Sequence, residues 1–270
     1  ELNTDAPSLP EPTTPRLGDG SGNVELRNVT FGYGDKPVLV DVTFHARPGT
    51  VTAIVGPSGS GKTTIARLIS RFWDVDSGAV MVDGVDIREL GTEQLMSRLS
   101  MVFQDVYLFD DSLIANIRVG RPDASDEEVF RAADLSGVTS IANRLGWHTP
   151  VGEGGRLLSG GERQRVSVAR ALLKQAPIVL FDEATSALDA ENEANILAAM
   201  DELREQSTFF VIAHKLDTIK SADQIVVLDE HGQVSQLGTH SELSDVPGIY
   251  RHFWQQRKAA SGWKISSGRD

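Results

Sequence analysis

The chain has 270 residues, 40% of them hydrophobic, and a formal net charge of −12. This length suits one large or two small domains with a real apolar core. The acidic balance argues against nucleic acid as a partner, because proteins that bind phosphate backbones usually present a basic face. The sequence contains no Cys, which excludes disulfides and thiolate metal sites.

No membrane span or signal peptide is expected. The sequence has no run of about 18 apolar residues. Its start lacks the basic and apolar stretches of a secretory signal. The chain begins with Glu1 rather than Met, so we expect it to be part of a longer protein.

The first third of the chain predicts a flexible linker followed by a β-rich region. Residues 1–22 are rich in Pro, Thr, Ser, Gly and acidic residues, a composition typical of linkers. Residues 24–31 and 38–47 then alternate apolar and polar side chains, which indicates half-buried antiparallel strands. A short buried strand over 51–55 leads through a Gly-rich loop into a helix over 62–72, and further strands are expected at 79–82 and 99–103.

The remainder predicts a helical insert inside an α/β core. Apolar spacing becomes helical from about residue 111 to residue 146, which predicts a helical insert over about 105–176, and the strands resume at residue 178. Strands that alternate with helices favour an α/β core with a mostly parallel sheet. We expect residues 259–270 to form a disordered tail. The expected helices are 112–118, 126–135, 138–144, 159–174, 191–206, a short one after 239, and 247–258; the expected strands are 178–182, 208–213, 224–229 and 233–237.

A complete phosphate-binding loop follows the buried strand 51–55. Residues 56–63 read GPSGSGKT and match G-x-x-x-x-G-K-[ST], with a strand before and a helix after. Glycines let backbone N–H groups converge on phosphate oxygens, and the helix N-terminus adds positive partial charge. Lys62 supplies a cation, and the Thr63 hydroxyl is the expected Mg²⁺ ligand. The expected nucleotide-binding residues are Gly56, Pro57, Ser58, Gly59, Ser60, Gly61, Lys62, Thr63 and Thr64, together with Tyr33.

A second buried strand ends in two carboxylates. Residues 178–182 read IVLFD, and Glu183 follows directly. Asp182 is expected to bind Mg²⁺ through a water molecule. Glu183 is placed to polarise a water molecule that attacks the γ-phosphate. The alternative for Glu183 is a solvated charge at a strand end.

The segment Leu-Ser-Gly-Gly-Glu-Arg-Gln-Arg at 158–165 narrows the class. Ser159 suits a helix N-cap, and two glycines permit close backbone approach. The segment resembles the signature sequence of ABC-type ATPases. The resemblance covers about residues 24–255, and the expected ATPase domain is 23–258. It implies a P-loop NTPase core with an N-terminal antiparallel β subdomain and a helical subdomain insert. It also implies that Ser159, Gly160, Gly161 and Glu162 contact ATP held by a second chain.

The resemblance assigns further residues in order along the chain. Tyr33 is similar to the aromatic residue that stacks on adenine, with core packing as its alternative. Gln104 is similar to the Q-loop glutamine that approaches Mg²⁺ and the attacking water. The segment 186–189 is similar to the D-loop, which crosses the dimer interface. His214 is similar to the switch histidine that reaches the γ-phosphate. Gln104, Glu183 and His214 are therefore the expected catalytic residues.

Residues 149–155 resemble the segment of exporter-fold ABC transporters that contacts the membrane domain. The expected function is thus an ATPase, with ATP and Mg²⁺, that powers transport. Its expected partners are a second nucleotide-binding domain, identical or different, and a transmembrane domain upstream on the same chain. The expected location is the cytoplasmic face of a membrane. The sequence also resembles actinobacterial siderophore half-transporters. The alternative is a soluble ABC ATPase in DNA repair, ribosome handling or Fe–S assembly.

Overall fold

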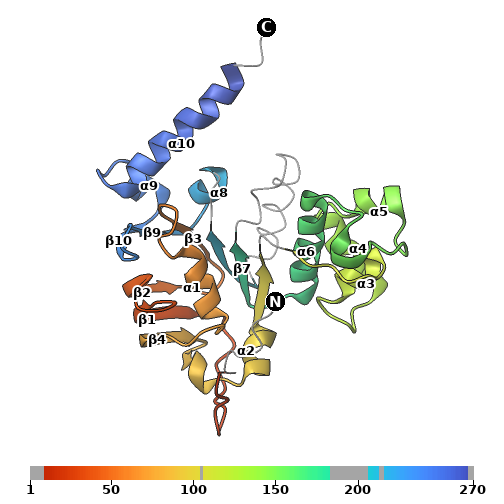
Figure 1. The fold of residues 1–270 in the computed structure, drawn as a ribbon, viewed down its shortest axis with the longest axis horizontal. Helices are drawn as coiled ribbons and strands as arrows, with labels where there is room; N and C mark the ends of the chain where they lie inside the picture. The colour runs from red at the N-terminus through yellow and green to blue at the C-terminus, as the bar shows by residue number, and fades with distance from the viewer. Residues whose placement is uncertain (1–8, 104–105, 183–205, 213–215, 267–270) are drawn as a thin grey trace.

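The computed structural model describes residues 9–103, 106–182, 206–212 and 216–266. It contains two β-sheets and a separate group of helices (Figure 1). The antiparallel sheet and the central sheet lie against each other. The helices of the insert lie beyond the far edge of the central sheet, and the C-terminal helix projects from the opposite end of the molecule.

The smaller sheet is antiparallel and has the order β2-β1-β4-β5. Side chains that face the core are buried along each strand, and those between them are more exposed, which is the alternation expected of a sheet with one wet face. This sheet confirms the predicted antiparallel β subdomain. Its strands are β1 (Val24–Phe31), β2 (Leu39–Ala46), β4 (Ser77–Val82) and β5 (Val85–Asp86).

The larger sheet has the order β10-β9-β3-β8-β7-β6. All neighbouring strands from β9 to β6 are parallel, and β10 alone pairs antiparallel. Every residue of β3, β7 and β8 is buried, which explains their continuous apolar sequences. The strands are β3 (Val51–Val55), β6 (Leu99–Val102), β7 (Ile178–Asp182), β8 (Thr208–Ile212), β9 (Gln224–Leu228) and β10 (Val234–Gly238).

Helices fill the chain between β6 and β7, as predicted for the insert. The longest of them in the described residues, α6, begins after Ser159, whose side chain caps it. None of these helices is a long coiled coil, the element that a repair-type ATPase would need. The helices in the described ranges are α1 (Lys62–Ile69), α2 (Thr92–Arg98), α3 (Leu113–Arg118), α4 (Asp126–Leu135), α5 (Thr139–Leu145), α6 (Gly160–Lys174), α8 (Leu216–Lys220), α9 (His240–Ser244) and α10 (Ile249–Ser266), with short 3₁₀ turns at Ile87–Glu89 and Glu153–Gly155.

The central sheet separates two apolar cores. The core on one face joins α1 to the antiparallel sheet and contains Ile65 and Leu68. The core on the other face joins α6 to the insert and contains Val166 and Leu172. Alternate residues of β7 and β8 point into the two cores in turn. Helices α1 and α6 therefore cover opposite faces of the same sheet.

Besides β5, α2 and α8, which the sequence analysis did not expect, the structure differs from the expected elements at three places. Helix α1 ends at Ile69 rather than residue 72, because Arg71 adopts a left-handed backbone (φ 51°). Helix α10 continues past residue 258 to Ser266. The segment 9–22, expected to be a linker, is hydrogen-bonded to the domain, for example through the Pro10 carbonyl to Arg71 (2.8 Å).

No helix in the described ranges is long and apolar enough to cross a membrane.

Candidate functional site

The phosphate loop connects β3 to α1, and its backbone geometry requires glycine. A Cβ at Gly56 would lie 2.7 Å from the Leu228 carbonyl oxygen. Gly61 has φ 91°, and a Cβ there would lie 2.5 Å from the Leu39 side chain. At Gly59, φ is +81° and no atom lies within 4 Å of a Cβ position. The loop is thus packed against the sheet on one side and open on the other, as a phosphate cradle must be.

The polar side chains at the start of α1 gather at this loop. Lys62 Nζ donates hydrogen bonds to the carbonyls of Gly56 (3.1 Å) and Pro57 (2.7 Å), so its cation lies within the loop. The Thr63 hydroxyl donates to Asp182 Oδ1 at 3.2 Å across 119 residues of sequence. Asp182 ends β7 and is 6% exposed. The structure therefore brings together two of the three residues that the sequence predicted around the metal; the third, Gln104, lies outside the described residues.

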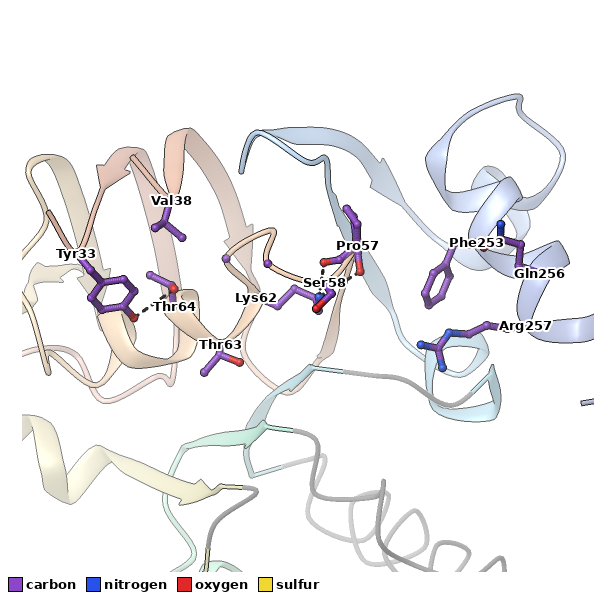
Figure 2. A pocket seen from close by; sticks show the side chains of 13 residues that line it. Tyr33, Val38, Pro57, Ser58, Lys62, Thr63, Thr64, Phe253, Gln256 and Arg257 are labelled. Atoms are coloured by element: carbon purple, nitrogen blue, oxygen red, sulfur yellow. Dashed lines mark hydrogen bonds between the residues drawn. The ribbon is translucent and has the colours of Figure 1, made fainter. Parts of the chain in front are cut away.

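A cavity of about 770 Å³ opens above the loop. Figure 2 shows Tyr33 and Val38 on one side of the loop and three side chains of α10 on the other. Ser60 does not line it, because its side chain is 1% exposed and faces inward. The lining residues are Tyr33, Val38, Gly56, Pro57, Ser58, Gly59, Gly61, Lys62, Thr63, Thr64, Phe253, Gln256 and Arg257.

The wall formed by Phe253, Gln256 and Arg257 was not anticipated from the sequence. Helix α10 reaches the loop because β9 pairs with β3, β10 pairs with β9, and the start of α10 is held on β10, where Tyr250 N donates to Gln236 Oε1 (2.9 Å). No motif marks this contact. Regular apolar spacing over 250–257 indicates a packed helix and gives no sign of its neighbour.

Three predicted catalytic residues, Gln104, Glu183 and His214, and the segment 186–189 lie outside the described residues. The structure describes the strands that precede them. Strands β6, β7 and β8 are adjacent and parallel, so their carboxyl ends share the edge that carries the phosphate loop. Ligand sites of open α/β sheets lie at this edge.

The segment predicted to bind a second chain's ATP forms the N-terminus of α6. The Ser159 hydroxyl accepts a hydrogen bond from the Glu162 amide (3.2 Å), and Glu162 Oε2 accepts from the Ser159 amide (2.8 Å). Burial of Glu162 opposes its ionisation, but hydrogen bonds from the Ser159 amide and the Arg144 guanidinium outweigh burial and lower the pKa of Glu162. The helix start is therefore rigid, and Ser159 remains exposed.

The starts of α1 and α6 share an edge of the sheet but lie apart. Helix α6 runs opposite to the strands, because its end at Lys174 leads into the start of β7. It packs beside β6, three strand spacings or roughly 14 Å along the sheet from β3. The two helices also cover opposite faces. One triphosphate bound at the loop thus cannot reach the start of α6 in the same chain.

Comparisons with known proteins agree with this architecture. The family model described as "ABC transporter" matches residues 39–186. The mycobactin import ATP-binding/permease protein IrtB of Mycolicibacterium thermoresistibile is 47% identical over 268 residues, which covers 97% of this chain and 46% of that protein. The ATP-dependent lipid A-core flippase of Vibrio vulnificus is 47% identical over 234 residues, covering 85% of this chain and 40% of the flippase.

A solved structure of a bacterial Atm1-family ABC exporter with ATP bound has a TM-score of 0.87 at 42% identity, covering 91% of this chain and 43% of that one. This likeness confirms the predicted fold class. The chain spans less than half the length of these relatives. The phosphate loop, the central sheet with its helical insert and the family match lead to one conclusion: this chain belongs to the ABC transporter family, of which it is an ATP-binding domain.

Proposed function

We propose that this domain hydrolyses ATP as one of two face-to-face copies or partners and so powers transport across a membrane. The observation that carries the proposal is the separation of two phosphate-receptive helix starts on one chain. Because one nucleotide cannot contact both, each chain offers half of a site. Two chains related by a two-fold axis complete two sites, each with the loop of one chain and Ser159 of the other.

The geometry around Gly160 supports an approach from outside the chain. Among the described residues, and apart from its own helix backbone, a Cβ at Gly160 would meet only the Arg163 guanidinium, at 4.0 Å. Gly160 also has no left-handed backbone. The chain's own packing therefore does not require glycine here. A phosphate or a second backbone that approaches the helix start would require it.

The residues at the loop fit Mg²⁺ bound with ATP. In the described part of the chain, no group of three or more His, Cys, Asp or Glu residues could hold a metal by itself. Mg²⁺ is usually held by one or two protein ligands together with phosphates and water, which matches Thr63 and Asp182. When bound, the cation neutralises charge on the phosphates. Lys62 holds the phosphates, and Asp182 orients the Thr63 hydroxyl.

We assign the reaction at the γ-phosphate to three residues, each of which follows one of three adjacent strands. Gln104 comes after β6, Glu183 directly after β7 and His214 after β8. On the family resemblance, Glu183 accepts a proton from the attacking water, and Gln104 and His214 position that water and the γ-phosphate. The order of these strands at the loop's own edge of the sheet supports the assignment.

A membrane domain is the proposed partner for transport. This chain spans less than half of its relative IrtB, which is named an ATP-binding/permease protein. That name supports a transmembrane domain upstream on the same chain. Large side chains on the insert are exposed: Tyr107 (58%), Phe109 (52%) and Val119 (48%). Segment 149–155 lies beside them, where Val151 N donates to the Asp111 carbonyl (3.0 Å). This surface suits docking of a membrane domain and supports a location at the cytoplasmic face of the membrane.

The identity of the transported molecule is a separate proposal. The IrtB match extends over 97% of the chain, against 85% for the flippase, which favours a siderophore-type small molecule. Identity is 47% to both, so the ATP-binding domain alone carries little information on cargo. Stimulation of ATP hydrolysis by ferric siderophores, but not by lipid A, in the full transporter would support it, and the reverse would exclude it.

Replacement of Glu183 by glutamine tests the proposed ATPase cycle. The variant keeps the shape of the side chain but cannot accept a proton, so hydrolysis should collapse while ATP binding persists. With ATP uncleaved, dimers should accumulate in size-exclusion chromatography, and phosphate release should fall. Near-normal phosphate release would remove Glu183 as the catalytic residue. Failure of the unchanged chain to bind ATP would overturn the function itself.

A further inference from the structure

Tyr33 is held in one orientation by two other aromatic rings. Its ring centroid lies 5.0 Å from that of Phe31, at an interplanar angle of 86°. On another side, Trp73 lies 5.1 Å away at 87°. Edge-to-face contacts at these distances are the favourable arrangement of aromatic pairs. Phe31 is buried, whereas Tyr33 (48%) and Trp73 (39%) are half-exposed, so the cluster is anchored inside and open outside.

The hydroxyl end of Tyr33 is tied to α1. The hydroxyls of Tyr33 and Thr64 share a hydrogen bond of 3.3 Å, visible in Figure 2. Arg67 Nη1 donates to the Tyr33 hydroxyl at 3.4 Å, and its guanidinium carbon lies 5.9 Å from the Trp73 ring centroid. Thr64 and Arg67 are three residues apart and share a face of α1. The helix that begins at Lys62 thus also fixes the aromatic ring at the other end of the cavity.

A tight turn after α1 places Trp73. Arg71 has a left-handed backbone (φ 51°), which is unusual for a side chain other than glycine. Its guanidinium is held by Asp74 (3.0 Å) and by the Pro10 carbonyl (2.8 Å). Such conformations persist when surrounding contacts determine them. The turn directs Trp73 back onto Tyr33.

We propose that Trp73 and Arg67 are positioning residues that pre-organise Tyr33 as the platform for the purine ring of the bound nucleotide. The inference rests on the proposed assignment of Tyr33 to adenine. A free aromatic side chain would lose rotamer freedom when a nucleotide binds, and one that is already ordered does not. Loss of the support is therefore expected to weaken nucleotide binding by about 2- to 12-fold, with the phosphate end unaffected.

The test compares a ligand that carries the purine ring with one that lacks it. In the Trp73→Ala variant of this chain, KM for ATP and the Kd of ATP should rise by about 2- to 12-fold with kcat unchanged. The Kd of tripolyphosphate, which lacks the base, should not change. Trp73→Phe should restore most of the ATP affinity, and Arg67→Ala should shift it in the same direction as Trp73→Ala.

Two further variants show whether the effect passes through Tyr33. In a Tyr33→Ala background, Trp73→Ala should weaken ATP binding no further, because the platform is already lost. Phe130→Ala is the matched control: Phe130 is an equally exposed aromatic (41%) that pairs with Trp147 at 4.7 Å on the helical insert. It should leave both affinities unchanged.

Three outcomes would overturn the inference while leaving the proposed function in place. The first is unchanged ATP affinity in Trp73→Ala. The second is an equal loss of tripolyphosphate affinity, which would mean a general disturbance of the loop. The third is a full additional loss in the Tyr33→Ala background. If the unchanged chain bound ATP no more tightly than it binds tripolyphosphate, the assignment of Tyr33 to the base would fail instead.

Discussion

Replacement of Ser159 separates the capping of α6 from a role in phosphate binding. In the structure the Ser159 oxygen accepts the Glu162 amide, and the Ser159 side chain also hydrogen-bonds the Glu162 carboxylate, a bond that a phosphate oxygen would have to replace. Loss of a Ser cap to alanine costs about 1 kcal/mol, and to glycine only a few tenths. For a domain of this size, Ser159→Ala should therefore lower the melting temperature by roughly 2–4 °C and Ser159→Gly by less than about 1 °C.

The two variants should nevertheless lose hydrolysis alike if Ser159 binds the partner's nucleotide. A hydrogen bond to a charged group contributes about 1.5–3 kcal/mol, so kcat/KM should fall by about 10- to 150-fold in both. Phosphate release is measured at 25 °C beside the melting curves. If hydrolysis instead followed stability, with Ser159→Gly near normal, Ser159 would be a helix cap alone. Ser159→Arg should block dimerisation and leave ATP binding to the monomer intact; loss of monomer binding would contradict the assignment in trans.

Two further predictions concern the loop cation and the C-terminal helix. Lys62→Ala should lose ATP and tripolyphosphate binding in calorimetry, since its cation lies within the loop, and retained affinity would contradict the phosphate site. His240 lies 2.8 Å from the Tyr250 hydroxyl, and burial, then the charge of Lys220, lower the pKa of His240. The stability that neutral His240 contributes is therefore present above its pKa in the unfolded chain, about 6.5, and is lost as pH falls through its pKa in the folded chain. The melting temperature should drop between pH 7 and 5 more steeply than in His240→Gln, and parallel curves would refute this.

The parts of the site that could be predicted are those encoded in continuous sequence. The functional residues of the loop 56–63 are adjacent in sequence, and β7 can be predicted from an apolar run that ends at Asp182. Their meeting at the Thr63–Asp182 hydrogen bond follows from parallel pairing through β8, which places both strand ends at one edge. The sequence thus contains enough to assemble the phosphate half of the site.

The parts of the structure that could not be predicted depend on contacts that leave no periodic pattern in the sequence. The approach of α10 to the loop follows from the pairing of β9 with β3, which are distant in sequence, and from the packing of α10 on β10, which pairs with β9. The early end of α1 follows from the left-handed conformation of Arg71, which local propensity disfavours. The pairing of distant strands leaves no pattern in the neighbouring sequence. The same is true of a left-handed backbone that is fixed by the hydrogen-bond partners of Arg71.

The segment 9–22 is the strongest departure from expectation, and truncation can test it. Gly22 N donates to Asp83 Oδ1 (2.7 Å) and the Pro10 carbonyl accepts from Arg71 (2.8 Å); Arg71 and Asp83 are 8% and 4% exposed. Hydrogen bonds to charged groups contribute about 1.5–3 kcal/mol each, so removal of residues 1–22 should destabilise the domain by about 3–6 kcal/mol.

Removal of residues 1–8 alone is the matched control, because both bonds remain, and it should leave the urea midpoint unchanged. Equal midpoints for the two truncations would show that the segment is only a linker. A lower midpoint for the longer truncation would mean that chain entering from the N-terminal side is fastened at Arg71, beside the turn that carries Trp73. The proposed upstream membrane domain could then act on Trp73, which supports Tyr33, directly through this segment rather than first through the helical insert.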